Sequence, residues 1–212
     1  MQRKKRNLLT LGAIGFAVLL FAILGIVQTD KSHKAVAIAQ DIPGSQDGLP
    51  TIGGAFQLVD TNEKVWKDTD FKGKPLLVYF GYSYCPDICP KALYHMTQAV
   101  EDLGGGKVVQ PIFITLDPQR DTVSQLQTHA QNYHKDFVML TGSKAEVDQA
   151  IKVYRVHTAR ASEEVGNNDY LVDHSSLIYL MDKDGLYRAH FNHQTPSSEI
   201  VKRVRLYLEK GE

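Results

Sequence analysis

The chain has 212 residues, and its 24 Lys and Arg residues balance its 24 Asp and Glu residues. A neutral chain with no long basic stripe beyond its amino terminus argues against a nucleic-acid partner. After Pro50 come about 160 residues of mixed apolar and polar character, which is enough for one domain with its own core.

The amino terminus carries the pattern of a membrane anchor. Residues 8–27 form an uncharged, largely apolar run that, as a helix, would span about 30 Å, the thickness of a bilayer core. The basic segment, residues 1–7, should stay cytoplasmic, which sends the linker, residues 28–50, and the domain, residues 51–212, across the membrane. A cleaved signal peptide is the alternative, although its apolar region is usually shorter, roughly 7 to 15 residues.

Short apolar runs alternate with amphipathic stretches along the domain. We predict strands at 55–59, 65–66, 76–80, 108–116 and 137–140, and helices at 92–103, 122–134 and 144–153. The run from Leu76 to Phe80 is nearly all apolar, as expected of a strand buried on both faces. Asp121 is expected to cap the helix that follows it. This alternation of strands and helices predicts an α/β fold.

The last third of the chain begins with a polar stretch, residues 157–173, which is too long for an ordinary connector. Loops of this length are often functional or mobile. Strands at 175–181 and 187–191 then flank the turn sequence Asp-Lys-Asp-Gly at 182–185, which predicts a hairpin. An amphipathic helix at 199–208 is predicted to end the domain.

The chain has only two cysteines, Cys85 and Cys89, directly after the buried strand. Two such thiols can close one disulfide, attack a substrate disulfide, or bind a soft metal ion as thiolates. A purely structural disulfide is the least favoured of these, because so short a loop constrains the unfolded chain little.

Two helix starts are compatible with the cysteine loop. Either Cys85 is the N-cap with Pro86 as the first helical residue, or Cys89 is the cap and Pro90 begins the helix. Both place a thiol at a helix N-terminus, where the macrodipole lowers a pKa that is about 8.5 in a free cysteine. A reactive pair is therefore expected.

A third functional group should lie at the same edge of the sheet, because reactive groups of open α/β sheets gather beyond the carboxyl ends of the strands. His174 is the candidate, since it ends the long polar stretch and precedes a predicted strand. His190 and His193 are rivals for this role. Sequence alone does not decide among eight histidines.

These residues lead to a family resemblance. From Gly53 onward the chain resembles the Sco/SenC family of membrane-anchored, thioredoxin-like copper proteins. The resemblance rests on Gly-Gly-x-Phe at 53–56, Tyr-Phe-Gly-Tyr-Ser-Tyr-Cys-Pro-Asp-Ile-Cys-Pro at 79–90, Leu-Asp-Pro-Gln-Arg-Asp-Thr at 116–122, and Val-Asp-His-Ser at 172–175 with Tyr-Leu at 179–180. It implies a thioredoxin-like central sheet flanked by helices, with copper bound by Cys85, Cys89 and His174. Ser83 and Leu116 depart from the family's usual threonine and isoleucine, and neither is a ligand.

The chemistry of the donor atoms agrees with that implication. Two thiolates and one imidazole form a soft site suited to Cu(I), and they can also hold Cu(II). Structural zinc would want a fourth protein ligand, which His190 would have to supply. Asp87 and Asp173 adjoin the candidate ligands and could orient the imidazole or adjust the charge. The simpler interpretations are a helix-dipole carboxylate for Asp87 and a turn residue for Asp173.

The resemblance implies a metallochaperone that delivers copper to the dinuclear centre of cytochrome c oxidase subunit II. Another copper chaperone and a thiol reductant are further expected partners. The domain would face the periplasm or the intermembrane space from a bacterial or mitochondrial inner membrane. One alternative is a thiol-disulfide oxidoreductase that reduces the acceptor's cysteines, although the usual redox motif has two residues between its cysteines and this chain has three. A copper or redox sensor is a third hypothesis.

Overall fold

The structure is a computed structural model that describes residues 50–160 and 170–210. Its strands are β1 (Gln57–Asp60), β2 (Val65–Lys67), β3 (Leu76–Gly81), β4 (Gln110–Thr115), β5 (Val138–Thr141), β6 (Thr158–Arg160), β7 (Val172–His174), β8 (Leu177–Met181) and β9 (Tyr187–Asn192). Its helices are the short 3-10 helix η1 (Asp68–Phe71) and the α-helices α2 (Ile88–Leu103), α3 (Val123–Ala130), α4 (Lys144–Val153) and α5 (Ser197–Lys210).

Seven strands form one mixed sheet in the order β2-β1-β5-β4-β3-β8-β9. Strands β3, β4 and β5 run parallel, while β1 and β8 add to their two sides in antiparallel register. Every residue of β3 is buried, which confirms the prediction from the apolar run at 76–80. Strand β3 is therefore a central element of the core, and its carboxyl end leads into the cysteine loop.

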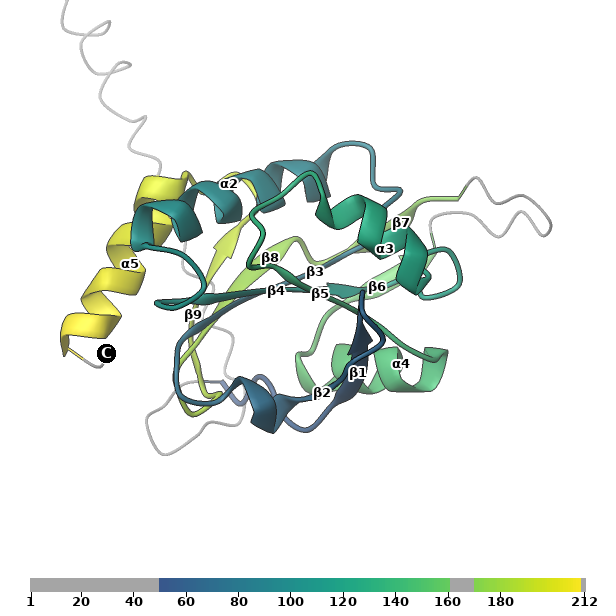
Figure 1. The fold of residues 1–212 in the computed structure, drawn as a ribbon, viewed down its shortest axis with the longest axis horizontal. Coiled ribbons are helices and arrows are strands. Elements are labelled where there is room, and N and C mark those ends of the chain that lie inside the picture. The colour runs from purple at the N-terminus through teal and green to yellow at the C-terminus, as the bar shows by residue number, and fades with distance from the viewer. Residues whose placement is uncertain (1–49, 161–169, 211–212) are drawn as a thin grey trace, which may run out of the picture. The chain divides into compact units, whose positions relative to one another are not determined.

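Helices cover both faces of this sheet (Figure 1). Helices α2 and α3 lie on one face and α4 lies on the other, while α5 packs beside α2. Helix α2 ends at Gly104, whose φ of 97° is left-handed and whose N–H bonds back to carbonyls of the last turn. The predicted α/β fold, with a central sheet flanked by helices, is confirmed.

The predicted cap of α3 is wrong by one residue. Thr122, not Asp121, is the N-cap, and its side chain accepts a hydrogen bond from the N–H of Gln125. The carboxylate of Asp121 is instead fully buried, where it accepts hydrogen bonds from the N–H and hydroxyl of Ser83 and from the hydroxyl of Thr115. Asp121 therefore joins the cysteine loop to the end of β4.

The polar stretch at 157–173 contains strand structure that its sequence did not predict. Strands β6 and β7 pair antiparallel as a separate two-stranded sheet, with Thr158 opposite His174. Residues 161–169, between them, lie outside the described part of the chain. His174 is thus the last residue of a strand, which holds its backbone in place.

The predicted basic segment, membrane span and nearly all of the linker lie outside the described residues, which begin at Pro50. Within 50–160 and 170–210, no helix has both the length and the apolar character needed to cross a bilayer.

Removing the buried carboxylate should destabilise the fold. We expect Asp121→Ala to lower the free energy of unfolding of the reduced, full-length chain by about 3 kcal/mol, because buried donors of Ser83 and Thr115 lose their acceptor. Denaturant unfolding followed by circular dichroism measures this. The exposed control Asp102→Ala should change stability by no more than about 0.5 kcal/mol. Equal effects of the two substitutions would contradict the role given to Asp121.

Candidate metal centre

The cysteine loop runs from the end of β3 to the start of α2. Neither predicted helix start holds, because α2 begins at Ile88 with Asp87 as the N-cap residue. Cys85 precedes the helix in a turn closed by its N–H and the carbonyl of Tyr82, and Cys89 lies in the first helical turn. Cys85 is 9% exposed and Cys89 is fully buried.

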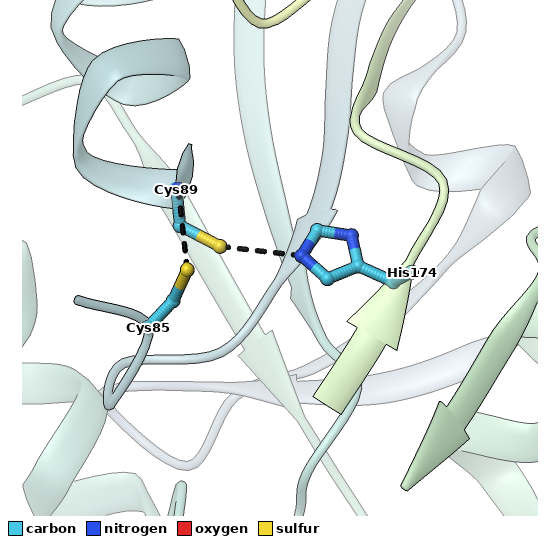
Figure 2. A group of neighbouring side chains, drawn as sticks. All are labelled: Cys85, Cys89 and His174. Atoms are coloured by element: carbon cyan, nitrogen blue, oxygen red, sulfur yellow. Dashed lines mark hydrogen bonds between the residues drawn. The ribbon is translucent and has the colours of Figure 1, made fainter. Parts of the chain in front are cut away.

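The two sulfur atoms lie in different electrostatic settings. The N–H of Cys89 is one of the free donors at the start of α2, and it donates to the sulfur of Cys85 over 3.4 Å (Figure 2). The positive end of the helix dipole therefore acts on Cys85, which accepts this bond from outside the helix. The expectation that a thiol meets a helix N-terminus holds, with Cys85 as the thiol that benefits.

His174 approaches the pair from strand β7. Its Nε2 atom lies 3.5 Å from the sulfur of Cys89 (Figure 2). Its Nδ1 atom lies 3.1 Å from the carbonyl oxygen of Ser175. Because a carbonyl only accepts, Nδ1 must carry the proton in that hydrogen bond. Nε2 is therefore the ring nitrogen that faces the cysteines, and a proton on Nδ1 is the arrangement that lets Nε2 of a neutral imidazole ligate a metal.

Among the described residues, Cys85, Cys89 and His174 are the one group of metal-ligating side chains with the right spacing, and their ligand atoms all lie within 4.8 Å of one another. Soft metals bond to sulfur and imidazole nitrogen at about 2.0 to 2.3 Å, as zinc does, which sets such ligands about 3.5 to 4 Å apart. Small side-chain rotations would therefore suffice to hold one ion.

Burial and hydrogen bonds shift the pKa values of the two thiols in opposite directions. The hydrogen bond with Cys89 lowers the pKa of Cys85, with further help from His174 and from N–H groups of the loop, and together these outweigh the effect of burial. The same contact with Cys85, together with burial, raises the pKa of Cys89. Of the two thiols, Cys85 is therefore the one that loses its proton more readily.

Aromatic rings and one glycine form the wall of the site. The rings of Tyr79 and Tyr82 meet the imidazole of His174 edge-on, with centroids 6.2 and 6.1 Å away. A methyl group at Gly81 would lie 2.8 Å from the sulfur of Cys89, so only glycine leaves room for that sulfur. Gly81 therefore serves a close approach of side chains, which its place in the motif did not reveal.

A buried ion pair holds the strand that carries His174. The guanidinium of Arg120 pairs with the carboxylate of Asp117, donates to the carbonyl of Tyr170 and lies 3.7 Å from the centre of its ring. The hydroxyl of Tyr170 donates to Asp117 over 2.8 Å, and the N–H of Val172 donates to the hydroxyl of Tyr82. These contacts fix the segment from Tyr170 to β7 beside the cysteine loop.

The structure places the remaining candidates away from the ligand atoms. Asp87 is exposed and pairs with Lys91 at 2.6 Å, and Asp173 is exposed on β7. His190 bonds to the hydroxyl of Tyr187 on β9, and neither it nor His193 joins the ligand group. Supporting roles for Asp87 and Asp173 stay predictions, whereas the carbonyl of Ser175 takes the place at Nδ1 that sequence analysis had offered to a carboxylate.

A helix-flanked mixed sheet, with two cysteines and a histidine at the carboxyl end of a central strand, defines a thioredoxin-like protein with a metal-ligand site. Comparison with known proteins makes this class specific, since the SCO1/SenC family model matches residues 44–209. The chain belongs to the SCO1/SenC family.

Individual relatives agree. An SCO2-like protein of Rickettsia prowazekii is 38% identical over 152 residues, which cover 71% of this chain and 74% of that protein. Bradyrhizobium japonicum ScoI with copper bound is 37% identical, with a TM-score of 0.68 over 74% of this chain and 99% of the other. Yeast Sco1 with copper bound is 33% identical, with a TM-score of 0.70 over 76% and 90% of the two chains.

The unequal thiols predict unequal reactivity. Because the pKa of Cys85 is lowered and that of Cys89 is raised, iodoacetamide should modify Cys85 first in the reduced chain. Its rate should hold nearly constant from pH 8 to pH 6, whereas a thiol with a pKa of about 8.5 would slow by nearly a hundredfold. Tandem mass spectrometry locates the label, and Cys85→Ser, which leaves Cys89 alone, should react slowly throughout. Preferential labelling of Cys89 would refute this assignment.

Proposed function

We propose that this protein is a metallochaperone that carries one copper ion on Cys85, Cys89 and His174. The observation that supports this most is the convergence of two sulfurs and one imidazole nitrogen within 4.8 Å, with Nδ1 of His174 held by the carbonyl of Ser175 so that Nε2 faces the sulfurs. That donor set suits Cu(I) and can also hold Cu(II). The group suits structural zinc less well, because zinc prefers four protein ligands and no fourth Cys, His, Asp or Glu of the described residues joins the group.

The cargo is delivered for assembly of cytochrome c oxidase, which is the role that membership of the SCO1/SenC family implies. Within this proposal the acceptor is the dinuclear copper centre of subunit II, another copper chaperone supplies the ion, and a thiol reductant keeps the two cysteines reduced. A reductant is needed because a disulfide has no thiolate to offer a metal.

The proposal also places the domain on a membrane. Residues 8–27 serve as a single-pass anchor in a bacterial or mitochondrial inner membrane, with residues 1–7 on the inner side and residues 28–50 as a linker. The domain, residues 51–212, then faces the periplasm or the intermembrane space. Its support is the apolar run of the anchor and the basic residues before it.

A thiol-disulfide oxidoreductase is the second candidate, and the lowered pKa of Cys85 favours it. A thiolate at a helix N-terminus is the usual attacking group in disulfide exchange. The histidine separates the two functions, because copper binding needs the imidazole and disulfide exchange needs only the two sulfurs.

Substitution of His174 distinguishes the metallochaperone from the thiol-disulfide oxidoreductase. We expect the reduced, full-length chain to bind one copper ion and the oxidised chain to bind none. His174→Ala should lose tight Cu(II) binding and weaken Cu(I) binding, yet keep a reducible Cys85 to Cys89 disulfide. Competition titrations with a Cu(I) chelator and the electronic absorption of the Cu(II) form measure this. The control His193→Ala, outside the ligand group, should bind copper as the wild type does.

In cells that lack the wild-type protein, His174→Ala should fail to support assembly of an active oxidase at ordinary copper levels. Full oxidase activity from this variant would sink the metallochaperone proposal and make thiol reduction the leading function. Equal copper binding by the oxidised and reduced chains would count against these ligands.

The anchor has its own test. A reporter enzyme that is active only outside the cytoplasm, fused after Glu212, should be active and should sediment with membranes, because the basic residues hold the amino terminus inside. Deleting residues 8–27 should abolish both results. A silent reporter on a well-expressed fusion would reverse the proposed topology.

A further inference from the structure

The hydroxyl of Tyr79 is buried next to the site without a hydrogen-bond partner. Tyr79 lies on β3 with no exposed surface, and its polar neighbours are the thiol of Cys89 and the hydroxyl of Ser176. Neither meets the Tyr79 hydroxyl at hydrogen-bond distance and angle in the described structure. A buried hydroxyl without a partner costs about 1 to 3 kcal/mol, so phenylalanine would be the more stable residue here unless another state of the site uses the hydroxyl.

The ring of Tyr79 and the sulfur of Cys89 border the same space beside Gly81. A methyl group at Gly81 would lie 2.8 Å from that sulfur and 2.9 Å from the Cε1 atom of Tyr79, so both atoms border one small space. Tyr79 and Gly81 are two residues apart on β3 and so point to the same face of the sheet. The same ring meets the imidazole of His174 edge-on. Tyr79 therefore lies on the side of the site where Cys89 is fully buried.

The hydroxyl of Tyr79 has no hydrogen-bond partner in the described structure, whereas the hydroxyl of the other tyrosine beside His174 has one. Tyr82 makes a similar edge contact with His174, but its hydroxyl already accepts a hydrogen bond from the N–H of Val172.

The chemistry of a cysteine ligand indicates what the hydroxyl of Tyr79 serves. A thiol sulfur is a weak hydrogen-bond acceptor. A cysteine that ligates a metal does so as a thiolate, and a thiolate sulfur accepts charge-assisted hydrogen bonds, which are about twice as strong as neutral ones. The hydroxyl of Tyr79 therefore gains a good acceptor at Cys89 when that cysteine ligates a metal.

We propose that Tyr79 is a positioning residue that donates a hydrogen bond to the thiolate of Cys89 when that thiolate ligates the metal. This inference rests on the proposed function, since it takes Cys89 as a ligand. Tyr79 then stabilises the metal-bound form over the metal-free form, in which its hydroxyl has no partner. Hydrogen bonds to a ligating cysteine sulfur also tune the electronic properties of the metal site.

The test compares Tyr79→Phe with the control Tyr179→Phe in the full-length chain. Both substitutions remove only a hydroxyl from a buried ring, but Tyr179 packs against Phe80 and Tyr154, away from the cysteines. In the reduced, metal-free chain, Tyr79→Phe should leave the thermal midpoint unchanged or raise it, because no hydrogen bond is lost. Its Cu(I) affinity should fall about tenfold, as expected for one charge-assisted hydrogen bond.

The spectrum of the Cu(II) form gives a readout that a merely structural role would not move. Loss of the hydrogen bond raises the energy of the thiolate electrons, so the sulfur-to-copper charge-transfer band of Tyr79→Phe should shift to lower energy. The control should keep the wild-type affinity and band.

Each result has a definite meaning. Wild-type affinity and an unshifted band in Tyr79→Phe would overturn the role of Tyr79 while leaving the proposed function intact. A lowered midpoint of the metal-free variant would overturn it as well, because the hydroxyl would then have a partner in that state. Failure of the wild-type chain to bind copper would overturn the proposed function and this inference together.

Discussion

The candidate metal site depends on a carboxylate that is not among its proposed ligands. Asp121 has no exposed surface, and it accepts hydrogen bonds from Ser83 in the cysteine loop and from Thr115 at the end of β4. Its own carbonyl accepts a hydrogen bond from Thr141 at the end of β5. One residue thus ties together the segments at the carboxyl ends of three parallel strands. Cys85 follows Ser83 by two residues, so this network sets where the first sulfur lies.

The segment that contains Asp121 also controls the histidine side of the site. Asp117 and Arg120 precede it in the loop after β4, and both hold Tyr170, which leads into the strand ending at His174. The loop after β4 therefore positions a cysteine through one network and the imidazole through another. Buried polar networks of this kind are stable only when their members are satisfied together, so the two halves of the site are expected to be fixed together.

The sequence predicted most elements of the fold, because apolar periodicity reports which residues enter the core, and the motif around Cys85 predicted the candidate site. Prediction from sequence failed where the role of a residue depends on partners distant in the chain. Asp121 before Thr122 has the pattern of a helix cap, and only the folded chain shows that its carboxylate points inward. Strands β6 and β7 are three residues each, too short to show a period within the polar stretch at 157–173. The unpartnered hydroxyl of Tyr79 follows from packing, which no local pattern encodes.

The orientation of His174 has a consequence for how this site tolerates change. The group that fixes its tautomer is the backbone carbonyl of Ser175, where many metal sites use a carboxylate side chain. A carbonyl is present whatever residue stands at that position, so substitution of the side chain leaves the acceptor in place. It also carries no net charge and does not titrate. The path of the main chain therefore sets the acceptor at Nδ1, and that acceptor persists through substitution of residue 175 and through pH changes that would protonate a carboxylate in its place.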